Sequence, residues 1–261
     1  MKYAKKSLGQ NFLKDLNVIK KIINLVSIYD QHVLEIGPGK GALTNQILKK
    51  NPKSLILIEK DFVLFKELKD KYSSNKKIEI YNEDILKFDL EKKIKKNTIV
   101  FGNLPYNISS QILVKFIKFK KWLPKYSSLI FMFQKELAEK IVGKHDTPQY
   151  GRLSILTNFR LKSVNKFDIS PNCFIPKPKV ISTILLLKPI HKISYNININ
   201  SLEKITNALF SNKRKMINKS IKKIFVNQNK IGLIKNLDLK ARPSDLKPDK
   251  FYKITECFEK I

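Results

Sequence analysis

The stretch His32-Val-Leu-Glu-Ile-Gly-Pro-Gly-Lys-Gly-Ala42 decides the fold, because a short apolar strand runs into a glycine-rich turn and then a helix. The glycines let the backbone approach a ligand at the start of that helix, and three in five residues favour a bound ligand over a plain turn. Gly37, Gly39 and Ala42 also satisfy the dinucleotide-binding pattern, with Glu59 at a suitable distance for a ribose. A nicotinamide-dependent dehydrogenase is therefore an alternative at this point.

Short apolar runs alternate with segments of helical period along the chain, which predicts βαβ units and a mostly parallel sheet. The predicted strands are His32–Ile36, Ser54–Ile58, Lys77–Tyr81, Thr98–Phe101, Ser127–Phe133, Val164–Ile169 and Val180–Leu187. The predicted helices between them are Ala42–Lys50, Phe62–Tyr72, Ser109–Lys121 and Lys135–Val142. Only a proline-containing loop separates the last two strands, so we expect them to pair antiparallel at one edge of a seven-stranded α/β sheet.

The composition changes at Pro189–Asn200, after which no strand is predicted. Two amphipathic helices follow, and their apolar faces consist of Leu202, Ile205 and Leu209, then Ile217, Ile221 and Ile224. We expect a ligand-binding catalytic domain over residues 1–190 and a small all-helical domain over residues 191–261.

The charge balance favours a polyanionic partner. Lys and Arg number 52 against 22 Asp and Glu, which gives a net charge of +30. Basic side chains near phosphates release counterions, so nucleic acid is the natural partner. A lysine-rich coding bias is the alternative explanation, since only four of the basic residues are Arg.

The cysteines, the histidines and the apolar runs argue against several classes of protein. Cys173 and Cys257 are too few for a disulfide framework, which fits a reducing cytoplasm. The three histidines, His32, His145 and His191, are scattered, so we expect no metal site. No apolar run has the length of a signal peptide or a membrane span, so we expect no membrane association.

Two carboxylates follow successive strands of the predicted sheet. Glu59 ends the second strand and Asp84 lies just after the third, so both are expected at the carboxyl edge, where open α/β sheets bind ligands. A carboxylate at the first position suits ribose hydroxyls, and one at the second can accept from an adenine amino group. Either acid alone is more often a solvated loop charge, but the joint placement favours a site.

The segment Phe101-Gly-Asn-Leu-Pro-Tyr-Asn107 follows the fourth strand and is suited to holding a planar amine. The Asn103 side-chain oxygen and the Leu104 carbonyl are hydrogen-bond acceptors for amino protons. Pro105 restricts Leu104 to extended geometry and so directs that carbonyl. Tyr106 can stack on an unpaired base. A dehydrogenase has no need of this segment, which favours methyl transfer to adenine over hydride transfer.

Two further groups are candidates for RNA contact. Phe174 lies in a proline-stiffened loop and would close the base pocket opposite Tyr106, or else anchor the core. Lys177 and Lys179 in the same loop would then lie near phosphates. The helical domain carries a basic cluster that consists of Lys213, Arg214, Lys215, Lys219, Lys222 and Lys223.

The chain resembles the ribosomal RNA adenine dimethyltransferases nearly from end to end. The resemblance is carried by Leu8-Gly-Gln-Asn-Phe-Leu13, Glu35-Ile-Gly-Pro-Gly39, Glu59, Asp84, Asn103-Leu-Pro-Tyr106, Gln134-Lys-Glu136, Tyr150-Gly-Arg-Leu-Ser154 and Phe174-Ile-Pro-Lys-Pro-Lys-Val180. Each motif is weak alone, but their order is specific. The loop Gly143-Lys-His-Asp-Thr-Pro148 departs from the family pattern, which leaves the RNA contacts there open.

The resemblance implies a Rossmann-like class I methyltransferase sheet that binds S-adenosylmethionine. It implies cofactor contacts from the residues at matching positions, namely Asn11, Leu13, Gly37, Gly39, Glu59, Asp84 and Asn103. The expected reaction is dimethylation of two adjacent adenines near the 3′ end of small-subunit ribosomal RNA, by a cytoplasmic monomer acting on a pre-assembled small subunit. Two alternatives are an assembly factor that acts chiefly by binding and a macrolide-resistance-type enzyme of large-subunit RNA.

Overall fold

The computed structural model describes residues 10–225, 234 and 237–260, so Leu8 and Gly9 of the first motif lie outside the described residues. The chain forms two compact units. Unit 1 contains the residues up to Ala138 and Lys162–Pro189, and unit 2 contains Glu139–Leu161 and the residues from Ile190 onward. The range 1–190 expected for the catalytic domain thus includes a segment, 139–161, that the structure groups with the C-terminal helices.

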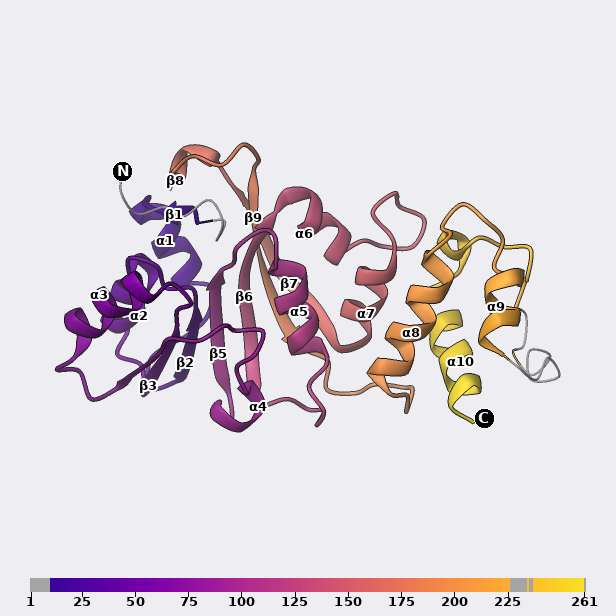
Figure 1. Cartoon of the computed structure of the whole chain (residues 1–261), viewed down its shortest axis with the longest axis horizontal. Coiled ribbons are helices and arrows are strands. Elements are labelled where there is room, and N and C mark those ends of the chain that lie inside the picture. Colours follow the sequence, from indigo (N-terminus) through magenta and orange to yellow (C-terminus); the bar gives the residue numbers. More distant parts are fainter. Residues whose placement is uncertain (1–9, 226–233, 235–236, 261) are drawn as a thin grey trace. The chain divides into compact units, whose positions relative to one another are not determined.

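Unit 1 contains a seven-stranded sheet in the order β4-β3-β2-β5-β6-β9-β7 (Figure 1). Its strands are β2 (His32–Ile36), β3 (Ser54–Ile58), β4 (Ile78–Tyr81), β5 (Thr98–Asn103), β6 (Tyr126–Gln134), β7 (Leu161–Ile169) and β9 (Ser182–Pro189). The first five strands of this order run parallel, and β9 is antiparallel to β6. The seven predicted strands are confirmed, with ends that differ by a few residues, and the last two are neighbours at the edge.

A second, two-stranded sheet was not predicted. In it β1 (Phe12–Leu13) pairs antiparallel with β8 (Phe174–Ile175). Phe12 lies opposite Ile175 and Leu13 opposite Phe174. The backbone amide of Lys14 donates to the Cys173 carbonyl at 2.8 Å and extends the pairing. Two segments far apart in the sequence are therefore held together over the large sheet's carboxyl edge.

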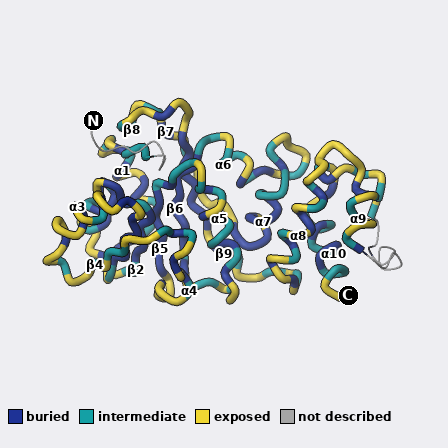
Figure 2. Tube along the Cα trace, viewed as in Figure 1, coloured by how far each residue is buried: buried dark blue, intermediate teal, exposed yellow. Residues whose placement is uncertain are grey.

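The helices of unit 1 cover both faces of the large sheet. They are α1 (Leu16–Ile23), α2 (Ala42–Lys49), α3 (Phe62–Tyr72), α4 (Leu90–Lys93), α5 (Ser109–Ile117) and the first part of α6 (Lys135–Ile141). Side chains of β6 alternate between the faces, as the pleat requires. Ile130 and Met132 join the core cluster that includes residues of α1, α2 and α3, whereas the ring of Phe131 packs on Phe116 of α5 at 5.4 Å. The central strands are buried along their length (Figure 2).

Unit 2 is helical, as expected for the C-terminal part of the chain. Its helices are α7 (Arg152–Arg160), α8 (Ile199–Phe210), α9 (Asn218–Ile224) and α10 (Pro248–Glu259). Helix α8 contacts the other three. The rings of Phe210 and Phe251 stack at 5.5 Å between α8 and α10, and the Tyr150 hydroxyl donates to the Leu246 carbonyl at 2.8 Å. The two predicted amphipathic helices correspond to α8 and α9.

The sheet order brings four strand ends to one edge. In register, Ile36 pairs with Ile58 on one side and with Gly102 on the other, and Ile58 pairs with Tyr81. The residues that follow β2, β3, β4 and β5 therefore lie next to one another, as expected of a crevice at the carboxyl ends of parallel strands.

Candidate active site

A cavity of about 330 Å³ lies at this carboxyl edge, within unit 1. Its wall includes every residue predicted for cofactor contact: Asn11, Leu13, Gly37, Gly39, Glu59, Asp84 and Asn103. It also includes the rest of the predicted adenine-holding turn, Leu104, Pro105 and Tyr106. The structure thus brings together the glycine loop, the two strand-end carboxylates and the turn after β5.

The glycine loop needs glycine for two reasons. Gly37 and Gly39 have φ angles of +65° and +57°, in the left-handed region that favours this residue. A Cβ on Gly39 would lie only 3.0 Å from the Phe12 ring. The loop is therefore packed closely beneath β1 while its backbone remains open to the cavity, as a bound nucleotide requires.

Glu59 is fixed by the backbone of its own site. The carboxylate is 6% exposed and accepts hydrogen bonds from the amides of Gly39 at 3.1 Å and Asp61 at 2.8 Å. Burial raises the pKa of Glu59, and the two amide hydrogen bonds oppose that rise. A carboxylate has about four lone-pair positions. Each carboxylate oxygen can therefore still accept a hydrogen bond from a hydroxyl group of a ligand bound in the cavity.

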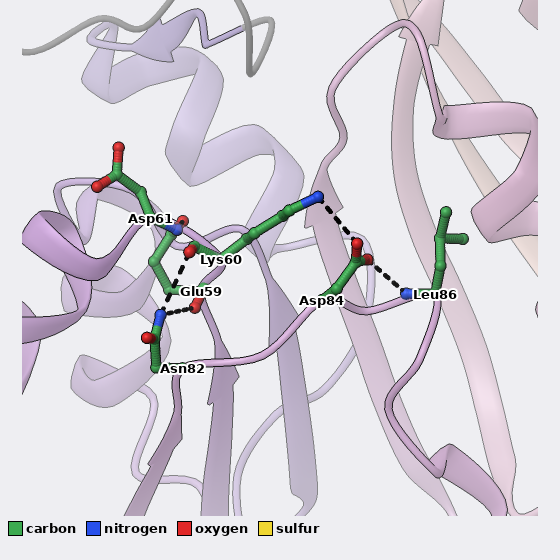
Figure 3. A network of polar contacts seen from close by, with 6 residues as sticks. All are labelled: Glu59, Lys60, Asp61, Asn82, Asp84 and Leu86. Atoms are coloured by element: carbon green, nitrogen blue, oxygen red, sulfur yellow. Dashed lines mark hydrogen bonds and ion pairs between the residues drawn. The ribbon is translucent and has the colours of Figure 1, made fainter.

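Asp84 is held by a different set of partners (Figure 3). One oxygen pairs with the Lys60 ammonium at 2.9 Å, and the other accepts from the Leu86 amide at 2.9 Å. The hydrogen bond from Lys60 is the main cause that lowers the pKa of Asp84. The side chain of Asn82 donates to the Glu59 carbonyl at 2.9 Å, which joins the ends of β3 and β4. The rim is thus a connected network, with an ionised carboxylate at Asp84.

The turn after β5 is tied to two other segments. The Asn103 side-chain amide donates to the Asn11 carbonyl at 2.8 Å, so the amide oxygen is the group left to accept. The hydroxyls of Tyr106 and Ser182 are hydrogen-bonded at 2.7 Å. The Ser109 hydroxyl donates to the Tyr106 carbonyl at 3.1 Å. Burial raises the pKa of Tyr106, which keeps the phenol neutral.

One buried acid lies below the glycine loop and was not assigned a role from the sequence. Glu35 on β2 is 1% exposed, and burial raises its pKa to about 7. The hydroxyl of Thr44 on α2 donates to this carboxyl group at 2.6 Å. Glu35 therefore links the strand before the loop to the helix after it.

The sequence pattern of the ribosomal RNA adenine dimethylase family matches residues 1–260. The chain belongs to this family. A ribosomal RNA small subunit methyltransferase A from Pelagibacter ubique (strain HTCC1062) is 43% identical over 258 residues, which cover 99% of this chain and 98% of that protein. A protein of the same name from a Wolbachia of Brugia malayi is 38% identical and covers 95% of this chain and 94% of its own length.

Solved structures agree with this membership. A dimethyladenosine transferase from Plasmodium falciparum superposes with a TM-score of 0.76 at 28% identity, over 93% of this chain and 95% of that one. The 23S rRNA methyltransferase ErmE has a TM-score of 0.69 at 24% identity, over 95% and 99% of the two chains, and bears on the fold alone. The predicted Rossmann-like class I methyltransferase fold is confirmed, and the dehydrogenase alternative is wrong.

Membership makes this dimethylase-family chain an enzyme that methylates adenine in ribosomal RNA with S-adenosylmethionine as the donor. The groups that line the cavity fit that cofactor chemically. The glycine loop leaves room for a nucleoside that carries an amino-acid tail, and a buried, backbone-held carboxylate can accept hydrogen bonds from a ribose. Among residues 10–225, 234 and 237–260, no group of three potential metal-ligating side chains occurs, and no helix has the length and apolar character needed to cross a membrane.

Of the two places expected for Phe174, the structure shows the one in the core and not the one in the base pocket. Its ring is 2% exposed and belongs to the core cluster, and it is not part of the cavity wall. Leu13 and Phe174 are opposite each other in the β1–β8 pair and both belong to that cluster, and of these two only Leu13 also reaches the cavity wall. Both residues of the neighbouring pair, Phe12 and Ile175, line the cavity. The strand's alternation therefore directs Ile175, and not Phe174, to the pocket.

The predicted RNA-binding residues all lie on the surface. Lys177 and Lys179 are exposed in the loop before β9 and are not part of the cavity wall. In unit 2 the exposed basic residues Lys213, Arg214 and Lys215 precede α9, and Lys219 lies on it. The Lys213 ammonium also donates to the Tyr150 carbonyl at 3.3 Å.

Several residues of the site were not predicted from the sequence. Phe12, Lys40 and Ile175 line the cavity, Lys60 pairs with Asp84, and Ser182 bonds to Tyr106. Lys40 and Lys60 could have been found, because Lys40 lies within the glycine loop and Lys60 follows Glu59 directly. Phe12, Ile175 and Ser182 depend on the β1–β8 pairing or on the place of β9 in the sheet, for which no local signal exists.

Proposed function

We propose that this chain dimethylates the N6 amino groups of two adjacent adenines near the 3′ end of small-subunit ribosomal RNA. The observation that carries the proposal is the single cavity shared by the glycine loop and the Asn103–Tyr106 turn. The curated relatives that cover nearly the whole chain are named as small-subunit methyltransferases, which supports the small subunit over the large one. The protein acts as a cytoplasmic monomer on a pre-assembled particle.

The chain's contribution to the reaction is to hold and orient an adenine. When bound, S-adenosylmethionine supplies an electrophilic methyl group on its sulfonium sulfur. The Asn103 Oδ1 and the Leu104 carbonyl accept hydrogen bonds from the N6 protons, which localises the nitrogen lone pair for attack. Pro105 fixes the direction of the Leu104 carbonyl. The Tyr106 ring stacks on the base, and no strong general base is needed, because the methylated ammonium releases its proton readily.

The other wall residues hold the cofactor. The backbone of Gly37 and Gly39 approaches its amino-acid portion, and Glu59 accepts from the two ribose hydroxyls. Asp84 would accept a hydrogen bond from the amino group of the cofactor's own adenine. Asn11 and Leu13 would also contact the cofactor, because both lie in the cavity wall. Backbone hydrogen bonds already hold the carboxylates of Glu59 and Asp84 in place, which supports these roles.

Exposed basic side chains position the particle. Lys177 and Lys179 lie in the loop that leads into β9, and Lys213, Arg214, Lys215 and Lys219 form a cluster in unit 2. Such contacts to phosphates add affinity and fix register, whereas the choice of base is made in the pocket.

The test is to incubate the protein with labelled methyl donor and unmethylated small subunits, with large subunits and free RNA in parallel. Mapping the labelled nucleotides is expected to give dimethyladenosine at two adjacent positions of small-subunit RNA only. Label in large-subunit RNA, or none in either particle across several magnesium concentrations, would overturn the proposal.

A matched variant separates catalysis from binding. Tyr106→Ala removes base stacking, which is worth about 1–3 kcal/mol, so we expect turnover to fall roughly tenfold to a hundredfold with unchanged cofactor affinity. Equal loss of both would mean that Tyr106 is structural.

If Glu59→Ala abolishes methylation while small-subunit maturation in cells is unaffected, the chain acts chiefly as an assembly factor.

A further inference from the structure

The hydroxyl of Tyr106 has a protein partner at the edge of the active-site cavity. It lies 2.7 Å from the Oγ of Ser182, the first residue of β9. Ser182 is fully buried, and Tyr106 is half-buried. The other end of Tyr106 is also held, because its carbonyl accepts from Ser109. The ring is thus fixed at the main chain and at the phenol oxygen.

The topology of the sheet explains how Ser182 reaches the site. Strand β9 is antiparallel to β6, and Ser182 pairs with Gln134, the last residue of β6. An antiparallel strand therefore brings its first residue to the edge where the parallel strands end. Tyr106 follows β5, which is next to β6 in the sheet. The next residue, Thr183, has a different partner, since its hydroxyl donates to Asp168 at 2.7 Å.

We infer that Ser182 is a positioning residue for methyl transfer, which holds the Tyr106 ring at the place where it stacks on the target adenine. The inference rests on the proposed role of Tyr106 in base stacking. The phenol oxygen lies on the axis of the Cβ–Cγ bond, so a hydrogen bond there leaves rotation about that bond free. It does fix the oxygen in space, and so restricts rotation about the Cα–Cβ bond, which sets the direction in which the ring points. A displacement of about 1 Å in a positioned group can cost on the order of a hundredfold in rate. Ser182 therefore acts on turnover without touching the cofactor.

The inference is tested by a double-mutant cycle with Ser182→Ala, Tyr106→Phe and their combination in the full-length chain. Thr183→Val is the matched control, because it deletes a buried hydroxyl at the next position of the same strand. We expect Ser182→Ala to lower kcat on small subunits about tenfold with unchanged affinity for S-adenosylmethionine. In the Tyr106→Phe background, where the phenol oxygen is already absent, Ser182→Ala should lower kcat no further. Thr183→Val should match the wild type.

A second measurement needs no RNA. The NMR signal of the Tyr106 ring carbon that bears the hydroxyl, assigned by its loss in Tyr106→Phe, reports ionisation. The hydrogen bond with Ser182 lowers the pKa of Tyr106, so Ser182→Ala should raise that pKa and Thr183→Val should not. Equal losses of kcat from Ser182→Ala in both backgrounds, or an unchanged Tyr106 pKa, would overturn the inference. Absence of methylation by the wild type would instead remove the proposed function.

Discussion

At the residue scale, the carboxylate of Glu59 is subject to two opposing effects. It is buried, which disfavours the charged form, yet two backbone amides hold it in place for a ligand. The cost of that burial is offset when hydroxyl groups of a cofactor add hydrogen bonds to the charged group.

Glu59→Gln tests this assignment directly. The amide nitrogen of Gln must face either a backbone amide or the ribose, and one acceptor is lost in both cases. Hydrogen bonds to charged groups are worth about 1.5–3 kcal/mol, so we expect the Kd for S-adenosylmethionine to rise roughly tenfold to a hundredfold. Isothermal titration calorimetry measures it. Glu67→Gln, on the exposed side of α3, makes the same charge change and should leave the Kd unaltered. An unchanged Kd for Glu59→Gln would remove the ribose role.

Glu35 gives a pH dependence of stability with a definite sign. Burial raises its pKa from 4.5 to about 7. Between these values the folded protein keeps a proton that the unfolded chain releases. Glu35 therefore stabilises the fold fully below pH 4.5, and this stabilisation is lost as the pH rises towards 7.

Replacement of Glu35 by Gln should remove that loss, because the amide is neutral at every pH and can still accept from Thr44. The free energy of unfolding of Glu35→Gln minus that of the wild type should increase by about 3 kcal/mol from about pH 4.5 to pH 8. Urea denaturation at several pH values measures the difference. If the two proteins lose stability in parallel, Glu35 is ionised in the fold.

At the scale of elements, helix α1 orders the segment that follows β1 and so supports the cavity wall. Asp15 caps it, since its side chain accepts from the amides of Asn17 and Val18. Ile19, Ile22 and Ile23 bury one face of the helix. Because β1 ends two residues before this helix, the cap also fixes the place where the cavity-lining strand ends.

Asp15→Ala is expected to reduce the free energy of unfolding by about 1 kcal/mol, the usual value of an N-cap hydrogen bond. Urea denaturation measures the change, provided that the free energy of unfolding depends on urea concentration with the same slope in both proteins. Asp70→Ala removes an exposed carboxylate from α3 and serves as the control. Equal effects of the two substitutions would show that the cap adds nothing to the stability of the fold.

These elements differ in how far the sequence predicts them. The central strands are clear because apolar runs are bounded by turns, and the cavity follows because parallel strand ends converge. Helix α1 could have been predicted from Asp15 and the spacing of its isoleucines. Helix α7 could not, since Ser154 and Thr157 are buried together with apolar residues, so no polar face marks its period. Likewise, no local pattern in Phe12 indicates its pairing with Ile175.

At the scale of the whole molecule, a net charge of +30 provides a general attraction for RNA but no location. The proposed cluster in unit 2 makes a sharper claim, namely that particular side chains contact phosphates. Each phosphate contact contributes about 0.7 to 0.9 to the slope of log K against log salt concentration, so the number of contacts can be measured.

Replacing four residues of the cluster, Lys213, Arg214, Lys215 and Lys219, by Gln tests this claim. If they contact phosphates, the salt slope for binding small subunits should fall by about 1 to 3, with the fold and the cofactor affinity preserved. A control with the same charge change replaces the exposed lysines Lys49, Lys50, Lys92 and Lys96 of unit 1. Filter binding from low to moderate salt gives both slopes. A similar fall in the control would mean that RNA responds to the overall charge, so that lysine content and not the cluster governs affinity.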